Sequence, residues 1–287
     1  MNRHPSVLFG APLILLCAFA HLPALAQSDV FRINDMDLRD PHVYVDVLGC
    51  RDVTDTALLG FSVNGRLQAS IQTDADVPSD GLLDLSTLIE FLPLDQSLTT
   101  NLMDSGSADC TAPIATTTCV RPIVPSGIAG DAALLSAGAC LAPITGTFRP
   151  YAPEIAVNSA PCFSSPSGTL VLNLGGIPVT LNDAQIAASF DGAPAGTLVN
   201  GLIKGFVTEA DADAALLPDT LPLMGGQPLS SVLPGGDPPG PNNTNCAAHS
   251  DVDIRNGVRG WWFYLNFTAT RVIVVDLFAD GFADGFE

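Results

Sequence analysis

Cysteine content is the feature that most restricts how this chain can fold. The sequence contains seven cysteines, of which Cys17 lies in an apolar leader and the rest lie downstream. An even number of cysteines in an exported chain is typical of disulfides, and no C-x-x-C spacing favours a metal site instead. Spacing alone does not fix the pairing. We expect the two short loops to close and the last pair to join the two halves of the chain: Cys110–Cys119, Cys140–Cys162 and Cys50–Cys246.

Residues 1–26 have the three parts of a secretory signal peptide. A short basic start is followed by an apolar stretch over 7–20 and by small residues at Ala24 and Ala26. The apolar stretch is shorter than the roughly 20 residues of a membrane-spanning helix, which disfavours an N-terminal anchor. We therefore expect a mature chain that begins at Gln27 and has no transmembrane segment. Its destination is the periplasm, the cell surface or the extracellular space.

The charge balance excludes several classes of partner. The chain carries 30 acidic and 11 basic residues, a formal net charge of −19. Such a field repels phosphate backbones and anionic membranes, so we expect no nucleic-acid partner. Only 14% of residues are charged and 47% are hydrophobic, a composition that predicts a globular rather than a disordered chain. Divalent cations would relieve the self-repulsion.

The N-terminal third of the mature chain is predicted to form strands. Residues 42–47 alternate β-branched and aromatic side chains, and Asn64-Gly65 is a strong hairpin signal between the short segments 61–63 and 66–68. Residues 82–92 fit a strand or a short helix, because periodicity does not separate the two. From about 101 to 167 the pattern breaks down, and we expect loops held by cross-links.

The C-terminal part has a clearer periodicity. Alternating apolar residues over 169–190 predict a three-stranded meander. Apolar pairs four residues apart over 198–207 predict a helix, and Thr208 resembles the first residue of a second, short helix. Residues 260–275 predict one long strand. The residues expected on one face of that strand are Trp261, Phe263, Leu265 and Phe267.

These patterns together predict a mostly β fold. We expect an antiparallel sandwich or barrel-like sheet, disulfide-linked, with one or two short helices packed on one side. The expected division is a signal peptide (1–26), a single β-rich domain (27–275) and an acidic C-terminal tail (276–287). The alternative is two halves, about 27–100 and 168–275, joined by the cysteine-rich loop region.

No catalytic motif is recognisable in the sequence. The mature chain has only His42 and His249, which disfavours histidine-based zinc sites, and it lacks a G-x-S-x-G elbow and a phosphate-binding glycine loop. Paired carboxylates for hydrolysis stay open, because any two acids can meet in a fold. Asp251 and Asp253 beside His249 suggest a mixed site or, more simply, an exposed strand edge. The run 261–264 suggests a sugar or lipid platform or, more in keeping with aromatic residues, a covered strand.

The acidic run between residues 73 and 84 is the strongest candidate for a metal site. Aspartates spaced around a glycine turn supply the oxygen ligands that calcium prefers. The run resembles the calcium loops of EF-hand, dockerin and thrombospondin type-3 proteins in the pattern D-x-D…D-G-x-x-D. It departs from them by two extra residues and by Thr87 in place of a closing glutamate, and a polar turn is the alternative. The resemblance implies a structural calcium ion held by Asp74, Asp76, Asp80 and Asp84.

The chain ends in a short acidic repeat. The segment 279–282, Ala-Asp-Gly-Phe, recurs at once as 283–286 and is followed by Glu287. This ending resembles the …F-x-D-G-F-E terminus of many exported, largely uncharacterised bacterial proteins. The resemblance covers about a dozen residues and implies a surface tag, a sorting tag or a flexible terminus, with no activity attached.

The functional expectation follows from export, acidity and the lack of motifs. We expect an envelope or surface protein with a non-catalytic binding or structural role, stabilised by calcium, whose partner is a surface, a glycan or an apolar ligand. The first alternative is a carrier of a lipid-like ligand, because the composition is unusually hydrophobic. The second is a secreted hydrolase that uses paired carboxylates. Oligomeric state is not predicted.

Overall fold

A computed structural model describes most of the chain between Ser28 and Val275. The expected signal peptide and the expected tail lie outside the described residues. Within those residues, no helix is long and apolar enough to cross a membrane. The described ranges are 28–46, 49–120, 127–219, 221, 225–236 and 246–275.

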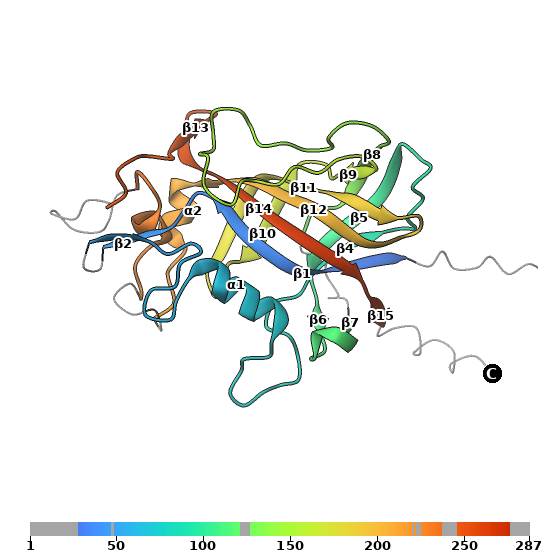
Figure 1. The fold of residues 1–287 in the computed structure, drawn as a ribbon, viewed down its shortest axis with the longest axis horizontal. Helices are drawn as coiled ribbons and strands as arrows, with labels where there is room; N and C mark the ends of the chain where they lie inside the picture. Colours follow the sequence, from blue (N-terminus) through green and yellow to red (C-terminus); the bar gives the residue numbers. More distant parts are fainter. Residues whose placement is uncertain are drawn as a thin grey trace, which may run out of the picture.

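A ten-stranded antiparallel sheet closes on itself (Figure 1). β1 pairs with β4 on one side and with β14 on the other, which makes a ring. β10 (Gly168–Asn173) and β13 (Asp253–Arg255) pair outside this ring, with β11 and β14. The ring confirms the predicted barrel-like, antiparallel fold. In ring order, which is also chain order, its eight strands are β1 (Asp29–Asp40), β4 (Thr87–Phe91), β5 (Thr100–Ser107), β8 (Gly130–Leu135), β9 (Cys162–Ser164), β11 (Pro178–Gly192), β12 (Ala195–Thr208) and β14 (Val258–Arg271).

Aromatic and aliphatic side chains fill the inside of the ring. The Phe91 ring contacts those of Phe31, Phe163 and Phe190, with centroids 6.2, 5.0 and 5.9 Å away. All four rings are buried. A ring of about eight strands is just wide enough for side chains to fill. The interior is therefore a packed core rather than a channel.

A loop covers the outer face of β12 and β14. On β14, Trp261 and Phe263 belong to the interior core, whereas Trp262 and Tyr264 belong to an outer apolar cluster. The segment between β8 and β9 lies over this face (Figure 1), and its Ile144 N–H donates to the Tyr264 hydroxyl at 3.0 Å. The predicted long strand is confirmed up to Arg271, where β14 ends, and both of its faces are buried here; residues 273–275, expected to continue it, form a separate strand.

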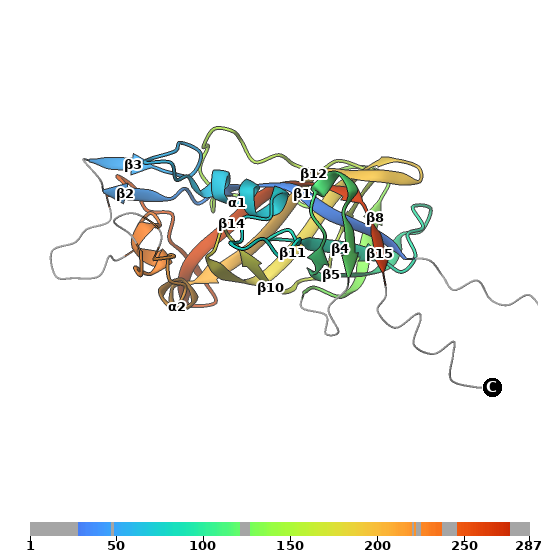
Figure 2. The same cartoon turned by 90° about the horizontal axis from the view of Figure 1, so that it is seen from below.

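Two small sheets lie toward opposite ends of the ring (Figure 2). The first contains a parallel pair, β7 with β15, and an antiparallel pair, β6 with β7. The second is the antiparallel pair of β2 and β3. Their bounds are β6 (Asp109–Cys110), β7 (Thr118–Val120), β15 (Ile273–Val275), β2 (Tyr44–Asp46) and β3 (Cys50–Asp52), with the 3₁₀ helix η1 (Ile114–Thr116) between β6 and β7.

Three disulfides cross-link the described part of the chain, in the pairing that we predict. One links β6 to β7, one ties the covering loop to β9, and one joins β3 to the segment before β13. The last closes a sequence separation of 196 residues. The pairs are Cys110–Cys119, Cys140–Cys162 and Cys50–Cys246.

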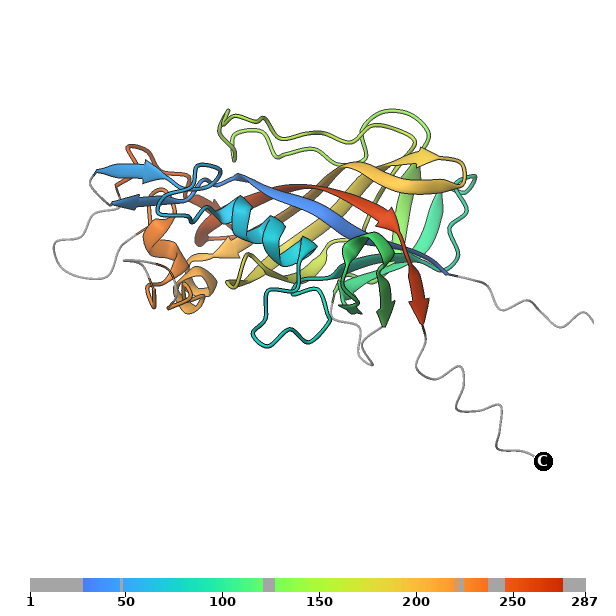
Figure 3. The ribbon, with the colours of Figure 1, turned by 60° about the horizontal axis from the view of Figure 1, so that its bottom comes forward.

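The helix α1 (Val63–Gln72) lies along β1 beyond the point where β4 stops pairing with it (Figure 3). The Asn64 side chain bonds the backbone of Leu38, accepting from its N–H at 2.7 Å and donating to its C=O at 3.0 Å. On the other side, a Cβ at Gly175 would lie 2.8 Å from that of Arg66, so the β10–β11 turn touches the helix. α1 thus lies between β1 and the β10–β11 turn.

Two local predictions are wrong because side-chain hydrogen bonds and burial outweigh the structural preference of the local sequence. The expected hairpin at Asn64-Gly65 is the first turn of α1, because the Ser62 hydroxyl caps the helix by accepting from Gly65 N–H. The expected helix over 198–207 is β12. A register shift between Leu198 and Gly201, together with burial on both faces, replaces the strand alternation with pairs of apolar residues.

Two further expectations are wrong in part, and one is confirmed. The region from 101 to 167, expected as loops, contributes β5, β8 and β9 to the ring. The meander over 169–190 has two strands rather than three, since β11 runs without a break. The short helix after Thr208 is confirmed as α2 (Glu209–Ala214), whose cap accepts from the Asp211 N–H. A second 3₁₀ helix, η2 (Leu229–Val232), packs on α2.

Candidate functional site

The predicted calcium loop follows α1 and brings three carboxylates together. Asp74, Asp76 and Asp84 each place an oxygen within 4.8 Å of the others. Asp80 does not belong to this group, and its Oδ1 accepts a hydrogen bond from the Leu82 N–H at 2.8 Å. We call Asp74, Asp76 and Asp84 the acidic cluster. It contains three of the four predicted ligands.

Hydrogen bonds hold the acidic cluster while its charges repel one another. Asp74 Oδ2 accepts from the Gly81 N–H at 2.7 Å and from the Ser79 hydroxyl. The Ser79 bond is the main cause that lowers the pKa of Asp74, whereas the negative charge of Asp84 is the main cause that raises the pKa of Asp76. Asp74 Oδ1 has no hydrogen-bond partner in the described part of the chain. A cation would relieve the repulsion and bond that oxygen.

A second group of polar side chains gathers near the β2–β3 end. His42 Nδ1 lies 2.5 Å from Asp52 Oδ2, and the His42 ring stacks on Tyr151 with centroids 3.7 Å apart. The Tyr151 hydroxyl oxygen lies 2.6 Å from His249 Nε2 and 2.7 Å from Asp251 Oδ2. We call these five residues the histidine cluster. It unites both histidines of the expected mature chain.

Proton counting orders the hydrogen bonds around Tyr151. A phenol has one proton, which the Tyr151 hydroxyl donates to the carboxylate of Asp251. The phenol oxygen then accepts from an Nε2–H of His249. Burial is the main cause that raises the pKa of Tyr151, and the bond to Asp251 adds to it. Tyr151 therefore stays protonated and links the two side chains.

Arg149 connects the histidine cluster to a buried acid. Its guanidinium pairs with Asp251, and its backbone N–H donates to Asp40 Oδ2 at 2.9 Å. Asp40 is 1% exposed, and its Oδ1 has no hydrogen-bond partner among the described residues. Burial is the main cause that raises the pKa of Asp40 to about 7, and the charge of Asp251 contributes.

The histidine cluster holds acid–base groups but leaves them little access. His42 is 5% exposed, and the side chain of Asp251 is also 5% exposed. The pKa of Asp52 would rise with burial, but hydrogen bonds from His42 and from the Thr54 N–H lower it. Sequence reasoning suggested a site at His249 and Asp251 without linking it to His42. The segments that meet here are far apart in the chain, so no spacing could link them. The one sequence signal that pointed to both histidines was that histidine is scarce.

The aromatic run does not form an open platform. Trp261, Trp262, Phe263 and Tyr264 are all buried. The Trp261 indole N–H donates to the carbonyl of Pro234 at 3.0 Å. A covered strand, the alternative that we favoured from sequence, is the correct one.

Two of the hollows lined by described residues lie outside these clusters. One is an apolar pocket near α2 and η2, with a volume of about 10 Å³, lined by residues such as Leu38, Leu221 and Phe263. The other is an open groove of about 460 Å³ between the end of α1 and η1. The first has room for about one water molecule. The second is large enough for a small ligand.

Comparisons with known proteins give no relative to reason from. No protein-family model matches the chain. No curated protein and no solved structure matches it either. The functional proposals therefore rest on the geometry described above.

Proposed function

We propose that this chain is an exported envelope or surface protein that acts by binding or structural support rather than by catalysis. The observation that carries the proposal is the filled ring, in which Phe31, Phe91, Phe163 and Phe190 occupy the interior. A core of this kind makes a rigid scaffold and leaves the outer face for partners. The disulfides Cys50–Cys246, Cys110–Cys119 and Cys140–Cys162 fit an oxidising compartment.

The packing favours this role over a lipid carrier. A carrier needs an enclosed apolar cavity, and binding pockets for small molecules have volumes of roughly 300 Å³ or more. The apolar pocket near α2 has a volume of about 10 Å³. The groove beside α1 is larger, but arginine, asparagine and glutamine side chains contribute to its lining.

The acids favour this role over a hydrolase. Asp40, with a pKa of about 7, and Asp251, paired with Arg149, resemble in charge the acid and base of a hydrolytic pair. Both side chains are almost fully buried, so a substrate bond would not reach them. Hydrogen bonds to Arg149 and Tyr151 fix Asp251 as part of a structural network.

Calcium completes the proposal as a structural ion. The acidic cluster offers three carboxylates on an exposed loop directly after α1, and the pKa of Asp76 is raised by its negative neighbours. A bound divalent cation would remove that repulsion and order the loop. Its role is to stabilise the loop, because no catalytic group is described beside it.

Mass spectrometry of the protein secreted from a bacterial host tests the proposal directly. The denatured mass should equal that of a chain beginning at Gln27 minus six hydrogens for Cys50–Cys246, Cys110–Cys119 and Cys140–Cys162. A mass that retains Met1, or free thiols, would contradict export into an oxidising compartment. The native spectrum separates the alternatives, since a lipid-sized adduct would favour the carrier.

The same native spectra test calcium. We expect one calcium adduct on the wild-type protein, lost in Asp76→Asn because that variant removes one ligand of the acidic cluster. Asp80→Asn is the matched control, because Asp80 lies in the loop but outside the cluster. Equal calcium binding by both variants would show that the cluster is an ordinary polar turn.

A further inference from the structure

The groove between α1 and η1 has an unusual lining for so acidic a chain. We call it the α1–η1 groove; it lies on the outer face, where the beginning of β1 and the end of β14 run together. Its lining contains two arginines and no carboxylate, although acids outnumber basic residues by 30 to 11 in the sequence. Its lining residues are Arg32, Asn34, Gln72, Ile114, Ala115, Thr117, Thr270, Arg271 and Val272.

The two arginines differ in how their charge is balanced. Arg271 pairs with Asp29, which lies outside the lining, and its guanidinium also donates to the carbonyl of Ala195. Arg32 is 1% exposed and has no carboxylate partner among the described residues. Burial lowers the pKa of Arg32 to about 10, so the guanidinium remains charged at neutral pH.

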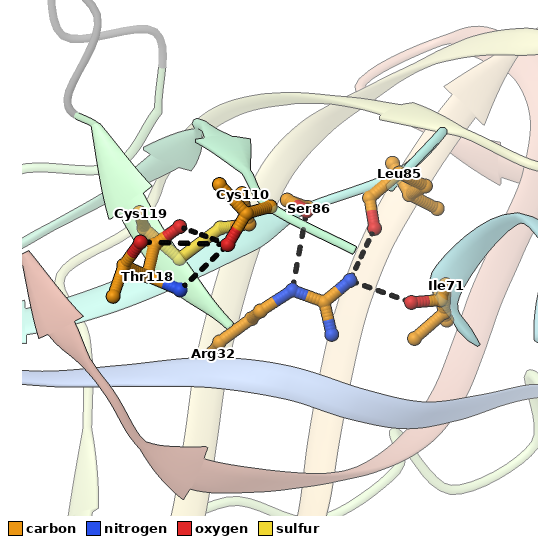
Figure 4. Close-up of a disulfide and its surroundings, with 8 residues drawn as sticks. Arg32, Ile71, Leu85, Ser86, Cys110, Thr118 and Cys119 are labelled. Carbon is orange, nitrogen blue, oxygen red and sulfur yellow. Dashed lines mark hydrogen bonds between the residues drawn. A yellow bond between two sulfur atoms is a disulfide. The ribbon is translucent and has the colours of Figure 1, made fainter. Parts of the chain in front are cut away.

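Neutral groups hold the Arg32 side chain in a fixed position. Nε donates to the Ser86 hydroxyl at 3.1 Å, and Nη2 donates to the carbonyls of Ile71 and Leu85 at 2.6 and 2.9 Å (Figure 4). Ile71 is in the last turn of α1, where carbonyls lack helical partners and a cation is favoured. Nη1 has no partner and points away from Ser86 and Leu85 (Figure 4).

A second unsatisfied group lies on the η1 side of the groove. The hydroxyl oxygen of Thr117 is buried and has no hydrogen-bond partner in the described part of the chain. A buried charge without a counterion and a buried hydroxyl without a partner are both costly. Both residues line the α1–η1 groove, so an acceptor bound there is the partner that we consider for each group.

We propose that the α1–η1 groove binds an oxyanion, a phosphate or carboxylate group, that accepts hydrogen bonds from Arg32 Nη1 and from the Thr117 hydroxyl. Arg271 adds positive charge at the rim of the site. This inference rests on the proposed binding role and names its ligand class. The oxyanion comes either from a free ligand or from the acidic C-terminal segment of the chain itself.

Titration calorimetry of the full mature chain with inorganic phosphate tests the site, against chloride at equal ionic strength. We expect saturable binding that Thr117→Val weakens roughly tenfold or more, because a hydrogen bond to a charged group is lost. Gln72→Glu should abolish binding, because it places a carboxylate in the groove beside Arg32. Gln96→Glu, the same charge change outside the groove, should bind phosphate like the wild type.

A variant with neutral tail side chains identifies the source of the oxyanion. Equal phosphate binding by this variant and the wild type assigns the groove to a free ligand, whereas binding by the variant alone assigns it to the tail carboxylates. No phosphate binding by either, or equal binding by Thr117→Val, overturns the proposal. Such a result would not bear on the proposed function, because that proposal is tested separately by the mass of the secreted chain. The substitutions are Asp276→Asn, Asp280→Asn, Asp284→Asn and Glu287→Gln.

Discussion

Asp40 shows how one side chain makes the stability of this protein depend on pH. It is buried at the end of β1, and its carboxyl group accepts one described hydrogen bond, from the Arg149 N–H. Its pKa is about 7 in the folded protein, against 3.8 for an ordinary aspartate. The unfolded chain therefore releases this proton at a lower pH than the folded protein does. The contribution of the buried neutral acid is fully present below about pH 4 and is lost as the pH rises through about 7.

Asp40→Asn should remove this part of the pH dependence. Asparagine stays neutral and keeps an oxygen that accepts from the Arg149 N–H. We expect the free energy of unfolding of the variant, relative to wild type, to rise by up to roughly 4 kcal/mol between about pH 4 and about pH 8. Urea unfolding across that range measures the difference. Parallel curves for the two proteins would show that Asp40 ionises normally.

The candidate sites differ in how far single residues could reveal them. Asp74, Asp76 and Asp84 lie within one short segment, so their spacing was enough to predict that they meet. Arg32 and Thr117 line the same groove although they lie far apart in the chain. No spacing in the sequence encodes that arrangement, and an arginine in an alternating segment reads as a solvated residue. Tertiary contacts alone identify it as buried.

At the scale of elements, β12 depends on close approach to its neighbours. A Cβ at Gly201 would lie 2.6 Å from the ring of Phe267 on β14. The Phe267 ring packs directly over the backbone of Gly201, because glycine has no side chain there. Gly196, on the same strand, has nothing within 4 Å of its Cβ position.

Gly201→Ala should therefore destabilise the protein, whereas Gly196→Ala should not. We expect a loss of roughly 1–3 kcal/mol for Gly201→Ala, because the core must shift to admit the methyl group. Chemical denaturation of both variants measures the effect, with Gly196→Ala as the matched control. Equal stabilities would mean that β12 and β14 separate without cost.

The elements that sequence predicted well are those in which one signal dominates. β14 shows its alternation clearly, and α2 begins at a capping threonine, Thr208. β12 was missed because both of its faces are buried and its register shifts. α1 was missed because Asn64 bonds β1 through its side chain instead of forming a turn. In both cases contacts with another strand contribute to the outcome.

At the scale of the whole molecule, the disulfides have unequal tasks. Cys110–Cys119 closes a local loop with a sequence separation of 9, whereas Cys50–Cys246 spans 196 residues. The second also flanks the histidine cluster, since Cys50 immediately precedes the segment of Asp52 and Cys246 precedes that of His249. Loss of Cys50–Cys246 should thus affect both stability and the cluster.

The double variant Cys50→Ser/Cys246→Ser should be less stable than wild type by roughly 2–5 kcal/mol. Amide hydrogen exchange should also increase at Tyr151 and His249, because their segments lose a covalent tether. Cys110→Ser/Cys119→Ser is the control, in which exchange at the histidine cluster should stay as in wild type. Unchanged exchange in the first variant would show that hydrogen bonds alone hold the cluster.

Closure of the ring has a consequence for how the chain acquires its fold. β1 pairs with β14, and the intervening strands follow one another around the ring in the order of synthesis. β1 therefore lacks its second neighbour until β14 has been synthesised. Contacts of such long range make folding slow. A nascent chain of this topology cannot complete its core on the ribosome before β14, its last long described strand, appears.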